Sequence, residues 1–393
     1  MKKVLDQTLF GSLLGFAFFS PWSIAGAQIC VGVAFLFLIL RISTDTRSFN
    51  FSREIIILPI VIYLLTQLLA ALLAPNPSQT LSAFKEEWIW IIYFIAAFSI
   101  TSKEQIGKIY AVLLVSSVLV ALYAVYQHFW GMDLYRNKVL PQFEPHNFAA
   151  MGFFGQHLTY GGYVMLILLF FLGWSGTLKL NFKFNLFYKV GLLILGLALI
   201  FSYARSAILG GVVGVLFWGM IKGKKLFLYL LAAVILLLGL VSILEPQLPK
   251  RIEYAFSPSH PSNSVRMGLW QTSWNMVKDK PIFGIGPGNF TKVFDQYKVP
   301  QEYDTIAHPH NDYLNVWVNS GIVGLLAYLF LWFSFLRRFA KNFSISIPVI
   351  TVLVGFLVAG LFQCYYTDQE VAMLLFFILG LGMAEIKLKQ NHG

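Results

Sequence analysis

The sequence His308-Pro309-His310-Asn311 places two imidazoles and an amide directly before a long apolar run. Pro309 favours an extended backbone at His308, and Asn311 or Asp312 can cap a helix that begins there. His310 then lies beside the positive end of this helix, which opposes protonation of its ring. Because a neutral imidazole can accept a proton, His310 is a candidate general base. A polar loop end without a chemical role and an H-x-H metal pair are the alternatives.

Two arginines are placed where an anion could be bound. Arg205, in "ALIFSYARSAILGGVVGVL", lies between two apolar runs with almost no loop, so we expect its guanidinium at or just below a membrane surface. An ionisable residue at this depth is a functional hypothesis with an anionic partner; a snorkelling arginine is the alternative. Arg266 shares a helical stripe with Trp270, Trp274 and Val277, which predicts an amphipathic helix in the interface. There Arg266 could meet lipid phosphates or a substrate.

The composition identifies the surroundings of these residues. Of 393 residues, 58% are hydrophobic and only 12% are charged, and the mean hydropathy is +0.69. A soluble domain has about 25% charged residues. The sequence therefore predicts an all-α, polytopic integral membrane protein with about twelve transmembrane helices. The expected spans are residues 8–20, 26–41, 55–74, 87–101, 108–130, 158–174, 187–203, 206–221, 226–244, 312–336, 346–366 and 368–386.

The cationic residues between these spans indicate the topology. Lysines and arginines gather on one side of the expected helices, which the positive-inside rule assigns to the cytoplasm together with both termini. The formal net charge of +11 is therefore a topology signal and not a nucleic-acid footprint. Two long segments, 131–157 and 245–311, then lie outside, and with the helix ends they carry six of the seven histidines.

These segments divide the chain into three parts. Residues 1–244 hold the first nine spans, residues 245–311 form an outer loop with an interfacial helix and a glycine-rich turn, and residues 312–393 hold the last three spans and a cytoplasmic tail. The first span could be taken for a signal peptide, but we expect it to be uncleaved because the parity of the spans then agrees with the charges. Cys30 and Cys364 both fall within expected helices, where buried apolar thiols are expected.

Three motifs together resemble a known family. "HNDYLNVWVNSGIVG" is a histidine and an amide, nine residues, and then Gly-x-x-Gly. This pattern is similar to the signature of the O-antigen ligase and polymerase superfamily of bacterial envelope glycosyltransferases. "SYARSAILGG" and "SVRMGLWQTSWNMVKDKPIFGIGPGNF" match the same family in order and spacing, so the resemblance covers roughly the C-terminal half. It implies a metal-independent, inverting transfer of a glycan from undecaprenyl diphosphate to an acceptor hydroxyl, on the periplasmic face of the bacterial inner membrane.

The resemblance also implies roles for individual residues. His310 is similar to the family's catalytic histidine, because Asn311 and the spacing to Gly321 fit it and do not fit His308. Arg205 and Arg266 resemble the pair that holds the donor diphosphate, and Asn311 is expected to bind substrate together with them.

The chemistry of these side chains agrees with the implied roles. The planar fork of arginine suits a diphosphate, and fixed cations stabilise the negative charge that a leaving diphosphate gains. Lys85, in "FKEEW" at the outer start of a helix, is a third possible cation, for which a plain interfacial lysine is the alternative.

Three functions remain open at this level. A ligase that transfers the glycan to lipid A core is preferred, since one strongly placed arginine pair fits one diphosphate. A polymerase of the same lipid-linked repeats needs a second diphosphate site, which Arg136, Lys138 or Lys292 could supply. A lipid or polysaccharide transporter or flippase is the third, although the helix interiors are nearly free of the charged residues of a proton relay. The expected partners are the lipid-linked donor, lipid A core and membrane lipids, with no cofactor, metal or nucleic acid.

Overall fold

The computed structural model describes residues 2–44, 56–144, 147–175, 182–244, 257, 261–300, 303 and 308–390. The helices of the first part of the chain are α1 (Lys2–Phe19), α2 (Ile24–Thr44), α3 (Ile57–Leu73), α4 (Pro77–Phe84), the 3₁₀ helix η3 (Lys85–Ile89), α5 (Trp90–Ser99) and α6 (Lys103–Trp130). Two short antiparallel hairpins follow, formed by β1 (Met132–Asp133) with β2 (Lys138–Val139) and by β3 (Gln142–Glu144) with β4 (Asn147–Phe148).

The rest of the described chain is helical. It comprises α7 (His157–Trp174), α8 (Phe182–Phe201), α9 (Arg205–Lys222), α10 (Lys224–Leu244), α12 (Pro261–Asp279), α13 (Phe290–Tyr297), α14 (Asp312–Ala340), α15 (Phe343–Ala359) and α16 (Gln369–Gln390).

Seven of the described helices are long and apolar enough to cross a membrane, namely α2, α6, α7, α8, α9, α14 and α16. The helices α3 and α15 are apolar but shorter. The chain is therefore an all-α, multi-pass membrane protein, as the composition predicts. The number of twelve spans, the outer loop and the cytoplasmic position of the termini stay predictions.

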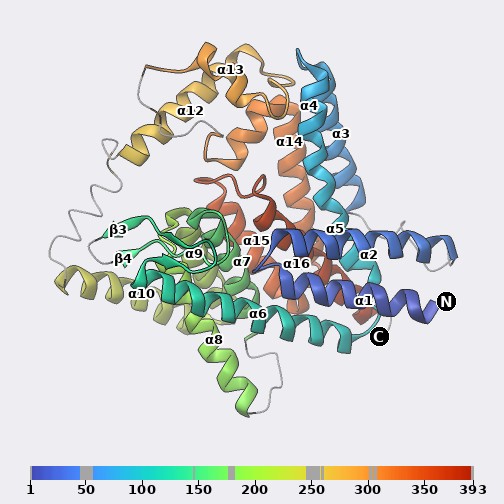
Figure 1. Ribbon diagram of the computed structural model, residues 1–393, viewed down its shortest axis with the longest axis vertical. Coiled ribbons are helices and arrows are strands. Elements are labelled where there is room, and N and C mark those ends of the chain that lie inside the picture. Colours follow the sequence, from blue (N-terminus) through green and yellow to red (C-terminus); the bar gives the residue numbers. More distant parts are fainter. Residues whose placement is uncertain are drawn as a thin grey trace.

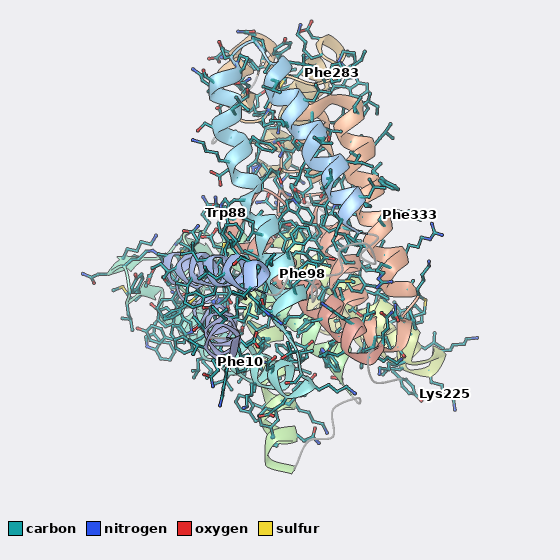
Figure 2. All side chains as sticks on the ribbon, turned by 90° about the vertical axis from the view of Figure 1, so that its right-hand side faces the viewer. Phe10, Trp88, Phe98, Lys225, Phe283 and Phe333 are labelled. Carbon is teal, nitrogen blue, oxygen red and sulfur yellow. The ribbon has the colours of Figure 1, made fainter. Side chains whose placement is uncertain are left out.

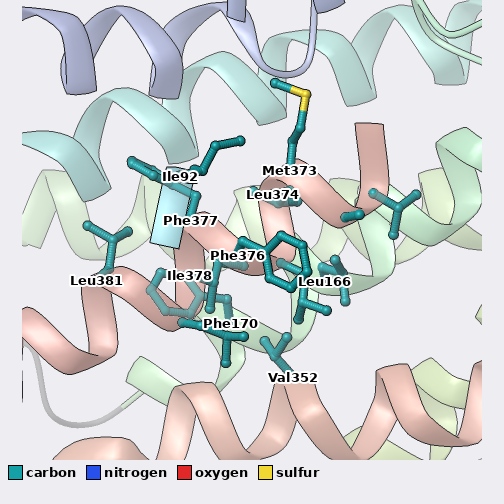
Figure 3. Close-up of a cluster of buried hydrophobic side chains, with 14 of the residues drawn as sticks. Ile92, Leu166, Phe170, Val352, Met373, Leu374, Phe376, Phe377, Ile378 and Leu381 are labelled. Carbon is teal, nitrogen blue, oxygen red and sulfur yellow. The ribbon is translucent and has the colours of Figure 1, made fainter. Parts of the chain in front are cut away.

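The helix α16 lies at the centre of the bundle. Its candidate span is 94% buried, whereas those of α2 and α8 are 28% buried. Phe376 and Phe377 of α16 belong to the same buried cluster as Leu166 of α7 and Val352 of α15 (Figure 3). Because lipid tails are as apolar as these side chains, close packing rather than exclusion from water must hold such helices together.

The outer helices expose large apolar side chains, among them Leu36 of α2, Leu65 of α3 and Leu193 of α8. Such faces suit lipid, in which they cost nothing to expose. The helices α1, α2 and α6 lie across the view in Figure 1, whereas α3 and the longer part of α14 run along its vertical axis. Figure 2 places Phe283, just after α12, far from Phe10 in α1. The two groups of helices do not share one direction.

The helix α14 is two helices joined at a sharp turn. Gly321 has φ 66° and ψ −170°, which lies outside the helical region. Fifteen residues of a straight helix would separate Tyr313 from Tyr328 by about 22 Å, but their ring centroids are 5.9 Å apart. The first segment, 312–320, therefore folds back along the second, 322–340. The sequence predicts one unbroken span at 312–336, whereas the structure has a turn at Gly321 inside this range. Glycine permits the turn because it has no Cβ.

The expected span at 346–366 is also corrected. The helix α15 ends at Ala359, and residues 360–368 form an irregular connection to α16. Cys364 lies in this connection and not in a helix, although it is buried and free; Cys30 lies in α2 and is also free. The 360–368 connection packs against His310 and Asn311, which precede α14.

Candidate functional site

Asn311 begins the first segment of α14 and ties it to the connection after α15. Its Oδ1 accepts a hydrogen bond from the backbone N–H of Leu314 at 2.9 Å, which is the predicted N-cap. Its Nδ2 donates to the carbonyl oxygen of Leu361 at 2.9 Å. The next residue, Asp312, donates its backbone N–H to the carbonyl of Gly360 at 2.7 Å. Asn311 is thus placed as a structural cap, and a substrate contact by this residue stays a prediction.

Asp312 strengthens the same attachment. Its side chain is 1% exposed, and Oδ1 accepts the backbone N–H of Tyr366 at 3.0 Å. A Cβ on Gly360 would lie 2.7 Å from Asp312 Oδ2, so the close approach requires glycine at that position. The histidine motif and the 360–368 connection consequently form one unit.

The ring of His310 is oriented by Gln363. Nδ1 of His310 lies 2.5 Å from Oε1 of Gln363. An amide oxygen can only accept a hydrogen bond, so in the neutral ring Nδ1 carries the hydrogen and Nε2 carries the lone pair. His310 has φ 50°, an uncommon conformation for a residue with a side chain. Its backbone N–H donates to Nδ1 of His308 at 3.2 Å.

The pKa of each histidine of the motif is lowered from its ordinary value, which favours the neutral ring. Burial lowers the pKa of His310; the hydrogen bond to Gln363 opposes this, and the charge of Arg266 adds to it. Burial and the neighbouring His310 lower the pKa of His308 to about 4. The two ring centroids are 4.5 Å apart. The sequence predicted a neutral His310 from the helix terminus, whereas burial and Arg266 are the causes that the structure identifies.

The helix α12 brings Arg266 to this motif. Trp270, one turn after Arg266, donates its indole N–H to the carbonyl of Pro309 at 2.8 Å. Burial lowers the pKa of Arg266, and the charge of Arg205 lowers it further. Within the described part of the chain, no carboxylate lies in ion-pair range of Arg266. Such a pair of cations would be stabilised by an anion between them.

Arg205 is the first residue of α9. The short connection before it bends at Tyr203, whose φ is 53°, and Ser202 Oγ accepts the backbone N–H of Ala204 at 3.2 Å. A cation at the positive end of a helix is unfavourable, whereas an anion there is stabilised. The next residue, Ser206, hydrogen bonds through Oγ with the hydroxyl of Tyr365 at 3.0 Å. The start of α9 is thereby joined to the same connection that holds His310.

The structure therefore links three predicted residues to one unit. Ser206, next to Arg205, bonds with Tyr365, and Gln363 of the same connection contacts His310. Trp270, one turn after Arg266, donates to Pro309 of the histidine motif. Burial raises the pKa of Tyr365, so this hydroxyl stays protonated and can donate. Lys85 is the first residue of η3 and has an exposed side chain. No contact described for it joins it to Arg205, Arg266 or His310. A role for Lys85 in binding stays a prediction.

A cavity of about 310 Å³ lies beside the histidine motif. His308 lines it, together with Glu86 and Glu87 of η3 and Tyr366 of the connection. Glu87 accepts hydrogen bonds from the hydroxyl of Tyr366 at 2.8 Å and from the indole of Trp90 at 3.2 Å. Burial raises the pKa of Glu87 to about 7, although its hydrogen bonds oppose the shift. The sequence did not predict that Glu87, Gln363 and Tyr365 belong to the site. The signal that could have pointed to each of them is that it is a polar residue within a largely apolar stretch.

The remaining described histidines have structural partners. Nδ1 of His128 lies 2.9 Å from the carbonyl oxygen of Phe148, and Nδ1 of His157 lies 2.8 Å from that of Ser202. His146 and His260 lie outside the described residues. Within the described residues, no group of three or more His, Cys, Asp or Glu is placed to hold a metal ion.

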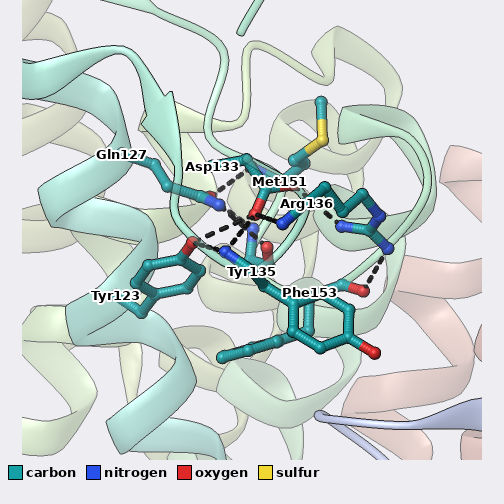
Figure 4. Close-up of polar contacts among 8 residues, drawn as sticks. Tyr123, Gln127, Asp133, Tyr135, Arg136, Met151 and Phe153 are labelled. Atoms are coloured by element: carbon teal, nitrogen blue, oxygen red, sulfur yellow. Dashed lines mark hydrogen bonds and ion pairs between the residues drawn. The ribbon is translucent and has the colours of Figure 1, made fainter. Parts of the chain in front are cut away.

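Arg136 is bound by other residues of the loop after α6. It pairs with Asp133 at 3.0 Å, and its Nη2 donates to the carbonyl of Phe153 at 2.7 Å (Figure 4). Lys292 donates to Gln79 Oε1 at 2.8 Å, and Lys138 is exposed on β2. These three cations, which could have formed a second diphosphate site, are not gathered in one place by these contacts.

Comparison with known proteins agrees with the motifs. Residues 190–329, from α8 to the second segment of α14, match a family model described as O-Antigen ligase. This stretch of the chain is therefore similar to the O-antigen ligase family. The matched stretch includes Arg205, Arg266 and His310, and the match confirms the resemblance on which the sequence analysis relied.

Two curated relatives illustrate the range of this family. The teichuronic acid biosynthesis protein TuaE of Bacillus subtilis is 26% identical over 298 residues, which cover 70% of this chain and 59% of that protein. The O-antigen ligase of Salmonella typhimurium is 27% identical over 99 residues, which cover 24% of each chain. The chain thus spans less than two thirds of the length of the relatives it matches.

Proposed function

We propose that this protein transfers a glycan from undecaprenyl diphosphate to a hydroxyl of lipid A core, on the periplasmic face of the bacterial inner membrane. One arrangement carries the proposal: both arginine-bearing helices are hydrogen bonded to the unit that holds His310. Trp270, one turn after Arg266, donates to the carbonyl of Pro309 at 2.8 Å. Ser206, next to Arg205, bonds with Tyr365 at 3.0 Å in the connection whose Gln363 contacts His310. An anion clamp and a candidate base therefore meet at one point.

The proposed reaction is an inverting displacement. The acceptor oxygen bonds to the anomeric carbon while the bond from that carbon to the diphosphate oxygen breaks, and the diphosphate leaves with the electron pair. Nε2 of His310 takes the acceptor proton, because Nδ1 already donates to Gln363. Arg205 and Arg266 bind the diphosphate and stabilise the charge that it gains.

The mechanism assigns different tasks to these side chains. Gln363 is a positioning residue, since it acts through the ring of His310. Tyr365 is placed to hydrogen bond a phosphate oxygen, because it lies near Arg266 and bonds to Ser206. No metal takes part in the proposed step.

Polymerisation of lipid-linked repeats is the second candidate. The relative aligned over most of this chain is named for teichuronic acid biosynthesis and not for O-antigen ligation. The two candidates differ in the acceptor: lipid A core for the ligase, and a second lipid-linked glycan for the polymerase.

Deletion of the gene in its host separates these candidates. For a ligase, the null mutant accumulates lipid-linked glycan and shows bare lipid A core, with polymer length unaffected. A null mutant whose lipopolysaccharide carries single, unpolymerised repeats would instead establish the polymerase. The matched control is complementation with the wild-type gene, which must restore the parental pattern in either case.

A further inference from the structure

The cavity beside His308 has the size of a small-molecule site. Its volume of about 310 Å³ lies at the lower end of the range of about 300–1,000 Å³ that such sites occupy. It is formed where η3, α13 and the first segment of α14 meet, with Tyr366 of the 360–368 connection on one wall. The cavity is therefore built by the elements that also hold the histidine motif.

The lining does not suit a diphosphate. Glu86 and Glu87 contribute two carboxyl groups, and the described lining residues include no lysine or arginine. A second anion here would meet carboxylates instead of cations. The diphosphate of the donor belongs with Arg205 and Arg266, and the cavity needs a different occupant.

The lining does suit the hydroxyl groups of a sugar. Carboxylates accept hydrogen bonds from sugar hydroxyls, and amides can accept or donate them. The rings of Tyr63 and Tyr366 supply apolar surface for the carbon–hydrogen faces of the sugar ring. Asn315 and Asn319 also line the cavity, and the Nδ2 of Asn319 donates to the Oδ1 of Asn315 at 3.1 Å.

The histidine motif connects the cavity with α12, the helix that carries Arg266. His308 lines the cavity, and the ring centroid of His310 lies 4.5 Å from that of His308. The indole of Trp270, one turn after Arg266, donates to the carbonyl of Pro309, which stands between the two histidines in the sequence. The candidate base is therefore close both to the cavity and to the helix of Arg266.

We infer that this cavity binds the sugar of the acceptor that carries the attacking hydroxyl. The inference rests on the proposed function and adds to it the acceptor subsite. The carboxyl groups of Glu86 and Glu87 hold the hydroxyls of that sugar, and His310 removes the proton of the one that attacks.

The test fills the cavity from an exposed position. Thr291 of α13 lines the cavity and is exposed, so Thr291→Trp adds bulk without disturbing the packed core. Gln296→Trp is the matched control, because Gln296 is exposed on the same helix and does not line the cavity. The full chain is assayed in detergent with undecaprenyl-diphosphate-linked glycan as donor, and with lipid A core or a second lipid-linked glycan as acceptor.

Thr291→Trp is expected to raise the KM for the acceptor about tenfold and to leave the KM for the donor unchanged, because it blocks a binding contact and not the reacting groups. Gln296→Trp is expected to behave as wild type. An active wild type whose Thr291→Trp variant keeps the acceptor KM, or raises only the donor KM, refutes the subsite alone. A wild-type chain that transfers to neither acceptor refutes the proposed function and the subsite with it.

Discussion

Replacing Gln363 by leucine tests whether the orientation of His310 matters for transfer. The substitution removes the oxygen that lies 2.5 Å from Nδ1 of His310 and puts an apolar side chain of similar size in its place. The lost hydrogen bond is worth about 1–1.5 kcal/mol, so kcat is expected to fall roughly fivefold to tenfold. The hydrogen can then occupy either ring nitrogen, and the tautomer with the lone pair on Nε2 is no longer favoured.

The pH profile of this variant separates a positioning role from a structural one. The base form of His310 is present above its pKa, so activity is lost as the pH falls through that value. Gln363 raises the pKa of His310, and its removal therefore moves the acidic limb of kcat to lower pH. Gln363→Glu is expected to move the limb to higher pH, because a carboxylate favours the protonated ring.

The assay measures transfer from undecaprenyl-diphosphate-linked glycan over a range of pH, with thermal unfolding of each variant as a check. Gln105→Leu is the control: Gln105 accepts a hydrogen bond from the backbone of Thr101 at 2.8 Å, outside the site. This control is expected to keep both kcat and the acidic limb. A Gln363→Leu enzyme with wild-type kcat and an unmoved acidic limb would refute the positioning of His310 by Gln363.

Three further predictions concern topology, metals and the turn in α14. Cysteines introduced at Ser259 and Ser344 should be labelled from outside only at the first position, and labelling at the second in intact cells would overturn the predicted topology. The purified enzyme should stay active in excess chelator; a loss of activity that Mn²⁺ or Mg²⁺ restores would favour a metal at the histidine motif. Gly321→Ala should lower the free energy of unfolding by about 1–3 kcal/mol, because φ is 66° and the added Cβ would overlap the backbone of Ile282. Unfolding of this variant in detergent at the wild-type temperature would contradict the argument.

Local rules predicted the parts of the site that local chemistry determines. The cap by Asn311 follows from the side chain's preference for the start of a helix, and the structure confirms it. Arg205 was singled out because a guanidinium between two apolar runs needs a partner. Arg266 was singled out because it shares a stripe with tryptophans on an expected interfacial helix. The two arginines are 61 positions apart in the sequence, and only the structure shows that α9 and α12 both contact the 360–368 connection.

The turn at Gly321 and the connection after α15 were not predicted, because apolar periodicity does not reveal a reversal of the chain. Residues on both sides of Gly321 read as one continuous helix, and its positive φ is visible only in the structure. Apolar and aromatic residues such as Phe362 and Tyr365 made the connection after α15 look helical, which concealed Gln363 as the partner of His310. Glu87 was not singled out, because one of its hydrogen bonds comes from Tyr366, far along the chain.

The central claim is that the cation pair binds the donor and His310 takes the acceptor proton. The most direct measurement compares donor binding and transfer in His310→Ala, Arg266→Lys and His308→Ala, each purified as the full chain. We expect His310→Ala to bind undecaprenyl-diphosphate-linked glycan but to transfer none of it. Arg266→Lys should impair transfer although its charge is retained, since an ammonium cannot form two parallel hydrogen bonds to phosphate oxygens. An inactive His308→Ala together with an active His310→Ala would contradict the account.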